Sequence, residues 1–317
     1  MTKLIIVNIP AYNEAENIEK VIKLIPRRIN DYEVKVQVID DWSQDATSQV
    51  AKSAWADYVI RHPYNQWVWV AFRTWVENFL EVWWDILVNI DGDWQFDPND
   101  IPELIEPLIK WIADISIASR FDKHKADNIP WIKERGNRAI AWIVGKLLRY
   151  KIQDLTCGFR AYNKKSLMKL NLLHMFTYTQ EVIIDAIGKK LKIIWIPVKV
   201  KYFADRKSRV TGSIRAYVKK SLMIIFRTVR DVKPLVFFWL PGLVSFIIGA
   251  LFLLTFLVLY LLSFRTTPYK MYLYVWSITL LFGLLLLIFA SIADMIKSQR
   301  RIAEENLEMM KKMRYDK

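Results

Sequence analysis

Two acidic residues and an amide, each one residue apart, follow a short apolar run of the chain. The run is residues 86–90, and Asp91-Gly92-Asp93-Trp94-Gln95 comes directly after it. Its β-branched residues predict a strand, and α/β sheets bind ligands at the carboxyl ends of their strands. Because side chains alternate along an extended chain, we expect Asp91, Asp93 and Gln95 to point the same way. Such oxygen ligands suit Mg²⁺ or Mn²⁺ that carries a phosphorylated substrate, and an acidic turn without metal is the alternative.

Strand and helix patterns alternate along the first two thirds of the chain. Strand patterns fall on residues 4–9, 34–39, 57–60, 86–90, 114–118 and 193–199, and helical patterns on 16–27, 45–54, 69–81, 99–111, 134–149, 164–170 and 179–190. This alternation predicts an α/β domain with a mostly parallel, doubly wound sheet. The first strand is not followed by G-x-G-x-x-G, so a dinucleotide-binding domain lacks its signature.

The positive charge of the chain is concentrated in its last third. Of a net charge of +14, residues 1–198 contribute 26 Lys and Arg against 25 Asp and Glu, and residues 199–317 contribute 20 against 7. The longest apolar runs lie in the same part, so the basic residues indicate anionic lipid rather than nucleic acid as a partner. Three His and the single Cys157 exclude a disulfide framework and argue against a Cys/His zinc site.

Two long runs near the C-terminus carry no charge. They cover residues 235–263 and 271–293, and each is long enough to cross a bilayer. We therefore expect a transmembrane hairpin with spans at 235–262 and 271–293; a buried helical pair in a soluble core is the alternative. Basic residues cluster outside the hairpin rather than in its loop, which predicts a multi-pass protein of the cell membrane with the N-terminal domain and both termini in the cytoplasm.

A helical pattern with one apolar and one basic face precedes the first apolar run. Its apolar positions are Ile214, Val218, Leu222, Ile225, Val229 and Val232. This pattern predicts an amphipathic helix in the membrane interface, with packing against the domain's own core as the alternative. The predicted organisation is a domain over 1–213, an interface helix over 214–233, a hairpin over 234–296 and a basic cytoplasmic tail over 297–317.

Six short segments, in this order and spacing, carry a resemblance to a known family. They are residues 9–14 (IPAYNE), 38–47 (VIDDWSQDAT), 91–95 (DGDWQ), 119–121 (SRF), 154–160 (DLTCGFR) and 209–213 (RVTGS). With them the chain resembles glycosyltransferase family 2 over residues 3–215, and within it the polyprenyl-phosphate sugar synthases, such as the dolichol-phosphate mannose and glucose synthases. The resemblance implies a GT-A type, Rossmann-like α/β domain.

The resemblance also implies roles for individual residues. The divalent cation would be held by Asp91, Asp93 and Gln95, and the reaction centre would contain Asp93, Arg120 and Asp154. The residues that would line the nucleotide pocket are Pro10, Tyr12, Glu14, Asp41 and Asp91. The arginines that would bind the phosphate of the acceptor are Arg120 and Arg209. Independently of the resemblance, Arg138 on an otherwise apolar helix is a further candidate for that phosphate, and a solvated surface charge is an equal interpretation of Arg138.

The implied reaction moves a hexose from a GDP- or UDP-sugar to a polyprenyl or dolichyl phosphate at the cytoplasmic membrane face, with inversion. A catalytically impaired relative that serves as a membrane-anchored binding or scaffold protein is the first alternative. A processive polysaccharide synthase is the second, but the chain has no Q-x-x-R-W segment. Nucleic acid is not an expected partner, and the apolar spans could pair between protomers and form a homo-oligomer.

Tryptophan stands at turn positions where the resembled family has glycine. The chain contains 14 Trp and only 9 Gly, with no Gly before Gly92. The affected positions are Trp42, Trp94 and one of Trp67 and Trp69. Glycine tolerates a positive φ and lets the backbone approach a ligand, whereas a bulky residue does so at a cost. We therefore expect either that the neighbouring structure opens around these rings or that the nucleotide pocket is damaged.

Overall fold

The computed structural model of the chain describes residues 3–65, 74, 76, 78–81, 84–121, 131–171, 178–201, 223 and 226–315. The chain forms two compact units. The first comprises Met1–Lys219 together with Glu308–Lys317, and the second comprises Lys220–Leu307.

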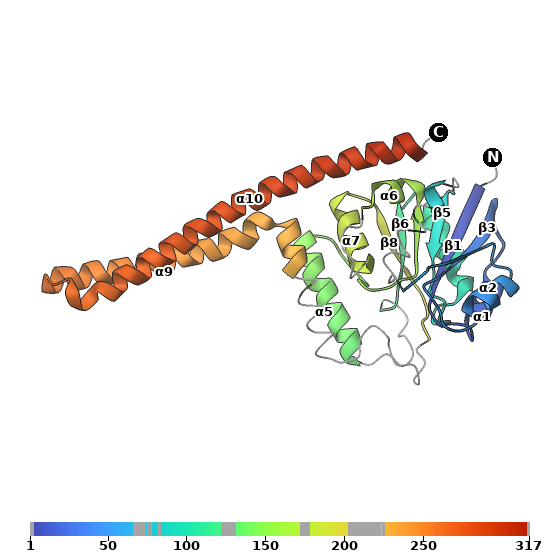
Figure 1. Ribbon diagram of the computed structural model, residues 1–317, viewed down its shortest axis with the longest axis horizontal. Coiled ribbons are helices and arrows are strands. Elements are labelled where there is room, and N and C mark those ends of the chain that lie inside the picture. Colours follow the sequence, from blue (N-terminus) through green and yellow to red (C-terminus); the bar gives the residue numbers. More distant parts are fainter. Residues whose placement is uncertain are drawn as a thin grey trace. The chain divides into compact units, whose positions relative to one another are not determined.

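A single eight-stranded sheet forms the centre of the first unit (Figure 1). Its order is β2-β3-β1-β5-β7-β6-β8, and β4 also pairs with β3. All pairs are parallel except β2 with β3 and β7 with both neighbours, which confirms the prediction of a mostly parallel sheet. The strands are β1 (Lys3–Ala11), β2 (Arg28–Ile29), β3 (Tyr32–Asp40), β4 (Tyr58–Arg61), β5 (Ile86–Asn89), β6 (Ile115–Ser119), β7 (Arg160–Asn163) and β8 (Ile193–Pro197).

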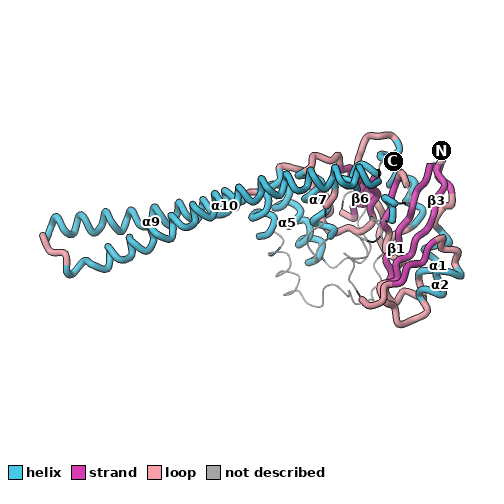
Figure 2. The backbone as a smooth tube through the Cα atoms, turned by 45° about the horizontal axis from the view of Figure 1, so that its top comes forward, coloured by secondary structure: helices cyan, strands magenta, loops and turns pink. Residues whose placement is uncertain are grey.

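Helices follow most of the strands, as the alternating pattern predicts. They are α1 (Ile18–Leu24), α2 (Thr47–Ser53), the 3₁₀ helix η1 (Pro98–Asp100), α4 (Ile101–Ile109), α5 (Trp131–Leu148), α6 (Lys164–Lys169) and α7 (Tyr178–Gly188). Helices α1 and α2 lie side by side next to β1 and β3 (Figures 1 and 2). The predicted helix over 69–81 lies largely outside the described residues, although residues 78–81 are helical.

The central strands are buried on both faces, which explains why they are nearly continuous apolar runs. Three buried amides interrupt these runs and bond to one another across the strands. Gln37 of β3 donates to Asn8 of β1 (3.3 Å), and Asn8 donates to Asn89 of β5 (3.1 Å). Asn89 in turn donates to the carbonyl oxygen of Gly158, just before β7 (2.9 Å). We call this series the amide ladder; it ties four parts of the sheet together in one register.

The second unit contains two helices long and apolar enough to cross a membrane, α9 (Pro234–Ser263) and most of α10 (Lys270–Tyr315), joined through η2 (Thr267–Tyr269). Residues 297–315 of the predicted tail are helical and belong to α10. Pairs such as Arg300–Glu304 and Arg301–Glu305, four residues apart, favour this helix. Most of the predicted interface helix lies outside the described residues, and residues 226–232 are helical.

Small residues allow α9 and the facing part of α10 to run side by side (Figure 2). A Cβ on Gly242 would lie 3.3 Å from the carbonyl oxygen of Gly283, and a Cβ on Gly249 would lie 2.6 Å from Oγ1 of Thr279. The Ser245 hydroxyl donates to the carbonyl oxygen of Thr279 at 2.9 Å. Close backbone approach through small residues, with a hydrogen bond across it, is how helices associate in membranes.

In the first unit, two helical glycines give a matched test of close backbone approach at a glycine. A Cβ at Gly145 of α5 would lie 2.6 Å from the backbone oxygen of Tyr150, whereas a Cβ at Gly188 of α7 would meet nothing within 4 Å. We expect Gly145→Ala to destabilise the domain by about 1–3 kcal/mol and Gly188→Ala to be neutral or to stabilise it by about 0.4–1 kcal/mol. Denaturant unfolding of both variants measures the difference, and equal effects would contradict it.

Candidate active site

The carboxyl edge of the sheet collects the predicted site residues. Register pairs Ala11 of β1 with Asp40 of β3, and Asn8 of β1 with Asn89 of β5. The segments that begin at Tyr12, Asp41 and Asp91 therefore leave the sheet at the same edge. Strand β6, which has the same direction as β5, ends just before Arg120, and the antiparallel β7 begins just after the segment that carries Asp154.

Acidic groups and arginines act on one another at this edge. Burial, followed by the charge of Asp93 and that of Glu14, raises the pKa of Asp91 to about 7, while the charges of Arg120 and Arg160 lower it. Two carboxylates that repel each other in a partly dry site are stabilised by a divalent cation, so Asp91 and Asp93 fit one chemically. Among the described residues, no group of three or more His, Cys, Asp or Glu could hold a metal. Further ligands would therefore come from Gln95, water or the phosphates of a substrate.

The segment from Asp91 to Gln95 is not extended, so the sequence-based reason for a common side-chain direction is wrong. Strand β5 ends at Asn89, and residues 92–95 form a turn and a bend. One carboxylate oxygen of Asp93 accepts a hydrogen bond from the backbone N–H of Gln95 at 3.1 Å, and Trp94 between them has a φ of 63°. The turn, rather than strand alternation, brings Asp93 and Gln95 together. The ring of Trp94 lies 5.7 Å from the ammonium of Lys201.

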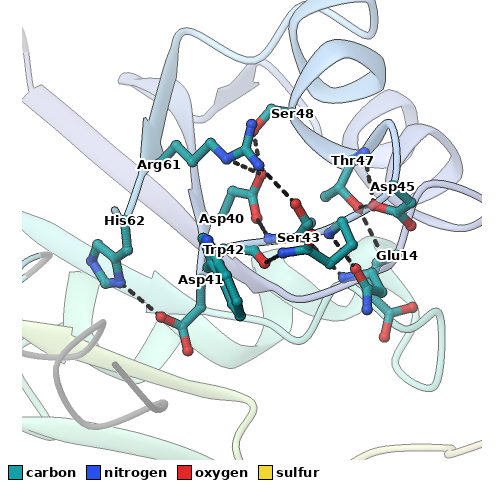
Figure 3. Close-up of polar contacts among 12 residues, drawn as sticks. Glu14, Asp40, Asp41, Trp42, Ser43, Asp45, Thr47, Ser48, Arg61 and His62 are labelled. Carbon is teal, nitrogen blue, oxygen red and sulfur yellow. Dashed lines mark hydrogen bonds and ion pairs between the residues drawn. The ribbon is translucent and has the colours of Figure 1, made fainter. Parts of the chain in front are cut away.

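The loop after β3 is held to the loop after β1 by a set of short polar contacts (Figure 3). The Ser43 hydroxyl accepts from the backbone N–H of Asn13 (2.9 Å), and the Thr47 hydroxyl accepts from that of Glu14 (2.9 Å). Asp40 accepts from the backbone N–H of Ser43 (2.7 Å) and from the hydroxyl of Ser48. These contacts fix the backbone around Tyr12, Glu14 and Asp41, the residues predicted to bind the nucleotide.

His62 is a residue of this site that the sequence did not reveal. It follows β4, is 6% exposed, and its Nδ1 lies 2.9 Å from a carboxylate oxygen of Asp41 (Figure 3). Its Nε2 is buried without a hydrogen-bond partner. The ring of Trp42 lies beside the Asp41 side chain in the same view and is 42% exposed. A single His after a short strand gives no periodic signal, so only the pairing of β4 with β3 identifies its place next to Asp41.

A buried ion pair joins the end of β6 to the segment before β7. Arg120 donates from Nε to one oxygen of Asp154 (2.6 Å) and from Nη2 to the other (2.9 Å) and to the Thr156 hydroxyl (2.6 Å). Asn137 of α5 and the backbone N–H of Thr156 also donate to Asp154, each at 3.1 Å. Burial alone would raise the pKa of Asp154, but the charge and hydrogen bonds of Arg120, with those of Thr156 and Asn137, lower it overall.

The three predicted phosphate-binding arginines have different surroundings. Arg120 is bound to Asp154, and Arg138 donates to the carbonyl oxygen of Phe121 (3.0 Å) and pairs with Glu134 (3.0 Å). The guanidinium groups of Arg120 and Arg138 both lie near the Phe121 ring, at 5.2 and 6.0 Å from its centre. Arg209 lies outside the described residues. The structure thus brings Arg120 and Arg138 to one aromatic ring.

Arg160 of β7 is a second residue missed from the sequence. Its side chain is fully buried, and its Nε donates to the carbonyl oxygen of Cys157 at 2.7 Å. Both of its Nη nitrogens are buried without a hydrogen-bond partner. Its charge opposes the rise in the pKa of Asp91, so it acts as a buried counter-charge to the acidic groups. The four-residue strand β7 is too short and too polar to be recognised by alternation.

The ion pair predicts a specific pH dependence of stability. Asp154→Asn leaves the guanidinium of Arg120 without its buried counter-charge and should lower the free energy of unfolding by about 3–5 kcal/mol at neutral pH. Because the folded-state pKa of Asp154 is lowered, its contribution is complete above the unfolded-state pKa of about 3.9 and is lost as pH falls below it. Chemical unfolding from pH 7 to pH 3 measures the difference in the free energy of unfolding between the parent and Asp154→Asn. This difference should be constant near neutral pH and should become smaller in acid. A difference that does not change with pH would contradict the role of the charge.

Comparison with known proteins agrees with this arrangement. Residues 6–170 match the model of the family Glycosyl transferase family 2. A UDP-N-acetylglucosamine–dolichyl-phosphate N-acetylglucosaminyltransferase of Methanococcus voltae is 29% identical over 66% of this chain and 90% of its own length. The dolichol-phosphate mannosyltransferase of Pyrococcus furiosus is 28% identical over 77% of this chain and 70% of its own length.

A solved structure shows the same fold at lower sequence identity. Glucosyl-3-phosphoglycerate synthase from Mycobacterium tuberculosis, in complex with Mn²⁺, UDP-glucose and phosphoglyceric acid, superimposes with a TM-score of 0.55 and 19% identity, over 72% of this chain and 79% of that one. The family match covers more than half of the chain and includes the edge of the sheet where the acidic groups and Arg120 meet. The chain therefore belongs to glycosyl transferase family 2 and is a glycosyltransferase with a GT-A-like fold.

Proposed function

We propose that this protein transfers a hexose from a nucleoside-diphosphate sugar to a polyprenyl or dolichyl phosphate at a membrane surface. The observation that carries the proposal is the edge of the sheet where Asp91 and Asp93 lie close to Arg120 and its partner Asp154. Anionic groups that suit a cation stand next to cationic groups that suit a phosphate. Such a pairing serves a reaction in which a diphosphate leaves and a second phosphate attacks.

The donor would occupy the side of the site formed by the first three parallel strands. Asp41, held by His62, would face the base, and the contacts of Asn13 and Glu14 with the β3 loop would shape the pocket for the ribose and diphosphate. Asp91, Asp93 and Gln95 would hold a divalent cation, which supplies charge stabilisation for the leaving diphosphate without proton transfer. The synthase of the same fold, solved with Mn²⁺ and with Mg²⁺, supports a divalent cation here.

The acceptor would approach the arginines. A polyprenyl phosphate is already anionic near neutral pH, so it needs positioning and shielding of its charge rather than a general base. Arg120 and Arg138, whose guanidinium groups both lie near the Phe121 ring, can supply hydrogen bonds to phosphate oxygens. Asp154 has a lowered pKa, and both of its carboxylate oxygens accept hydrogen bonds from Arg120. We therefore assign it the task of orienting Arg120 rather than of taking a proton.

The lipid character of the acceptor rests on two observations. The relatives from Methanococcus and Pyrococcus are named for dolichyl phosphate, and two helices of this chain are long and apolar enough to cross a bilayer. We extend the proposal to a multi-pass protein of the cell membrane with its catalytic domain (1–213) and both termini in the cytoplasm. In this arrangement residues 214–233 would lie in the interface, 234–296 would form the hairpin and 297–317 the basic tail.

A second function is favoured by one observation, the tryptophans at the site. Trp42 adjoins Asp41 and Trp94 stands between Asp93 and Gln95, both with positive φ. If these rings fill the nucleotide pocket, the protein would be an impaired relative that anchors or scaffolds other components at the membrane. Nucleotide binding separates the two functions.

The first test is calorimetric titration of the detergent-solubilised chain with GDP and with UDP, each with and without Mn²⁺. We expect one nucleotide to bind more tightly with Mn²⁺, and Asp93→Asn to weaken that binding by about tenfold or more, equivalent to about 1.4 kcal/mol. Glu106→Gln, at an exposed carboxylate of α4 that pairs with Lys110, is the matched control and should bind as the parent does. Binding that is indifferent to Mn²⁺ and to Asp93 would argue against the proposed donor site.

The stereochemical course is a further expectation. Direct attack by a phosphate oxygen of the acceptor forms a bond to the anomeric carbon on the face opposite the diphosphate, whose bond to that carbon breaks. An α-linked donor should therefore give a β-linked product. NMR spectroscopy of the anomeric proton in the lipid-linked product measures this, and a retained α configuration would exclude the single displacement.

A further inference from the structure

Four tryptophans adopt a backbone conformation that belongs to glycine. Their φ angles are 69° at Trp42, 70° at Trp55, 63° at Trp94 and 59° at Trp111. None of the glycines that the structure describes has a positive φ. The left-handed region is open to glycine because it lacks Cβ, is entered by Asn with little difficulty, and is a rare outlier for a bulky side chain. In the described part of this chain, tryptophan rather than glycine therefore occupies left-handed positions.

Trp55 and Trp111 end two helices in the same way. After α2, the N–H of Trp55 bonds to Lys52 and that of the next residue, Ala56, to Ala51, both at 3.1 Å. After α4, the N–H of Trp111 bonds to Leu108 (3.1 Å), and the N–H that follows bonds to Pro107 (2.9 Å). This double bonding pattern is the Schellman motif, which requires a left-handed residue and is usually completed by glycine.

No packing offsets the backbone strain at these two helix ends. Trp55 is 80% exposed and Trp111 is 81% exposed, so the indole rings stand in solvent. By contrast, Trp84 has an ordinary φ, is 3% exposed and makes an edge-on contact with Tyr58. Trp84 thus packs as a core tryptophan. Trp55 and Trp111 instead have a backbone conformation that favours glycine and side chains that are largely exposed to solvent.

Trp42 and Trp94 meet the same backbone demand inside the candidate site. Trp42 follows Asp41, and the backbone N–H of Ser43 immediately after it bonds to Asp40 at 2.7 Å. Trp94 lies in the turn that Asp93 closes onto Gln95. Each turn is formed by contacts of its neighbours, so its shape does not depend on an indole ring. A glycine would keep both turns and remove a bulky group from beside the proposed base and cation sites.

We propose that residues 42, 55, 94 and 111 are glycine in the protein made by its own cell. Tryptophan stands at these positions because one codon has been read as tryptophan where the cell of origin reads glycine. The triplet UGA is open to this, since it specifies tryptophan in some variant genetic codes and glycine in others. Reading glycine codons as tryptophan would raise the number of Trp and lower the number of Gly, and the chain has 14 Trp and only 9 Gly. The consequence for nucleotide binding rests on the proposed function, whereas the assignment of glycine does not.

The direct test is peptide sequencing by mass spectrometry of the protein purified from its native cells. Glycine is expected at positions 42, 55, 94 and 111, and the four codons should all be UGA. Tryptophan in the native peptides at these positions would overturn the proposal.

A test on the recombinant chain uses the two helix ends, which lie outside the candidate site. Trp55→Gly and Trp111→Gly should each raise the melting temperature by about 2–4 °C, because each relieves a left-handed bulky residue. Trp142→Gly is the matched control, since Trp142 is also exposed (64%) but has an ordinary φ in the interior of α5. There glycine should lower the melting temperature by a similar amount. A fall in all three variants would overturn the proposal.

The functional consequence is tested by the Trp42→Gly, Trp94→Gly double variant in titrations with GDP and UDP. We expect Mn²⁺-dependent affinity to rise at least tenfold over the parent chain, and Asp93→Asn in the same background to abolish the gain. A higher melting temperature at the helix ends without any nucleotide binding would refute the proposed function while leaving the glycine assignment intact. A lower melting temperature at the helix ends would refute the glycine assignment, whatever the nucleotide affinity.

Discussion

The register of the central strands is the constraint on which the rest of the structure depends. The amide ladder sets that register, because Gln37, Asn8 and Asn89 are buried and satisfy one another across β3, β1 and β5. A slip by one residue would turn these amides to the opposite face and leave them unpaired in an apolar core, at a cost of about 1–3 kcal/mol for each group. The ladder lies just beneath the edge where the strands end. It therefore determines which residues meet there: Asp41, Asp91 and the segments that follow them.

Charge balance is the second level of organisation at this edge. Burial raises the pKa of Asp91 most, and repulsion from Asp93 and Glu14 raises it further. The structure offsets this repulsion in part with the arginines Arg120 and Arg160, and Arg120 is itself held rigidly by the buried Asp154. A site built in this way is preorganised, because the groups that would meet a cation and a phosphate are fixed before either binds. The residual repulsion between the acids is the part that a cation would remove.

Hydrophobic periodicity predicted most of the fold, and the failures have physical causes. Strands β1, β5 and β6 are mostly apolar runs buried on both faces, β3 alternates between buried and more exposed residues in its first half, and amphipathic helices such as α4 have a regular apolar stripe. Strand β7 begins at the buried Arg160, and the sequence cannot show that the sheet buries this charge. His62 gives no pattern, because its position next to Asp41 depends on the pairing of β4 with β3. The turn at Asp91–Gln95 was predicted as extended, because the hydrogen bond that closes it is a property of the folded backbone.

At the four tryptophans with a positive φ, the backbone conformation is set by neighbouring hydrogen bonds and not by the tryptophan side chain. A left-handed residue is imposed by the hydrogen bonds of the residues around it, as at the ends of α2 and α4, where the paired N–H groups on either side fix the dihedral angles. The same demand arises at Trp42 and Trp94 from the contacts of Ser43 and Gln95. A sequence that specifies one structure agrees with its backbone at every such position. Among the described residues, tryptophan accounts for four of the nine non-glycine positions with a positive φ, at surface helix ends and in the site alike. A functional adaptation of the pocket would have no reason to appear at the solvent-exposed helix ends, so a common cause outside the pocket accounts for both.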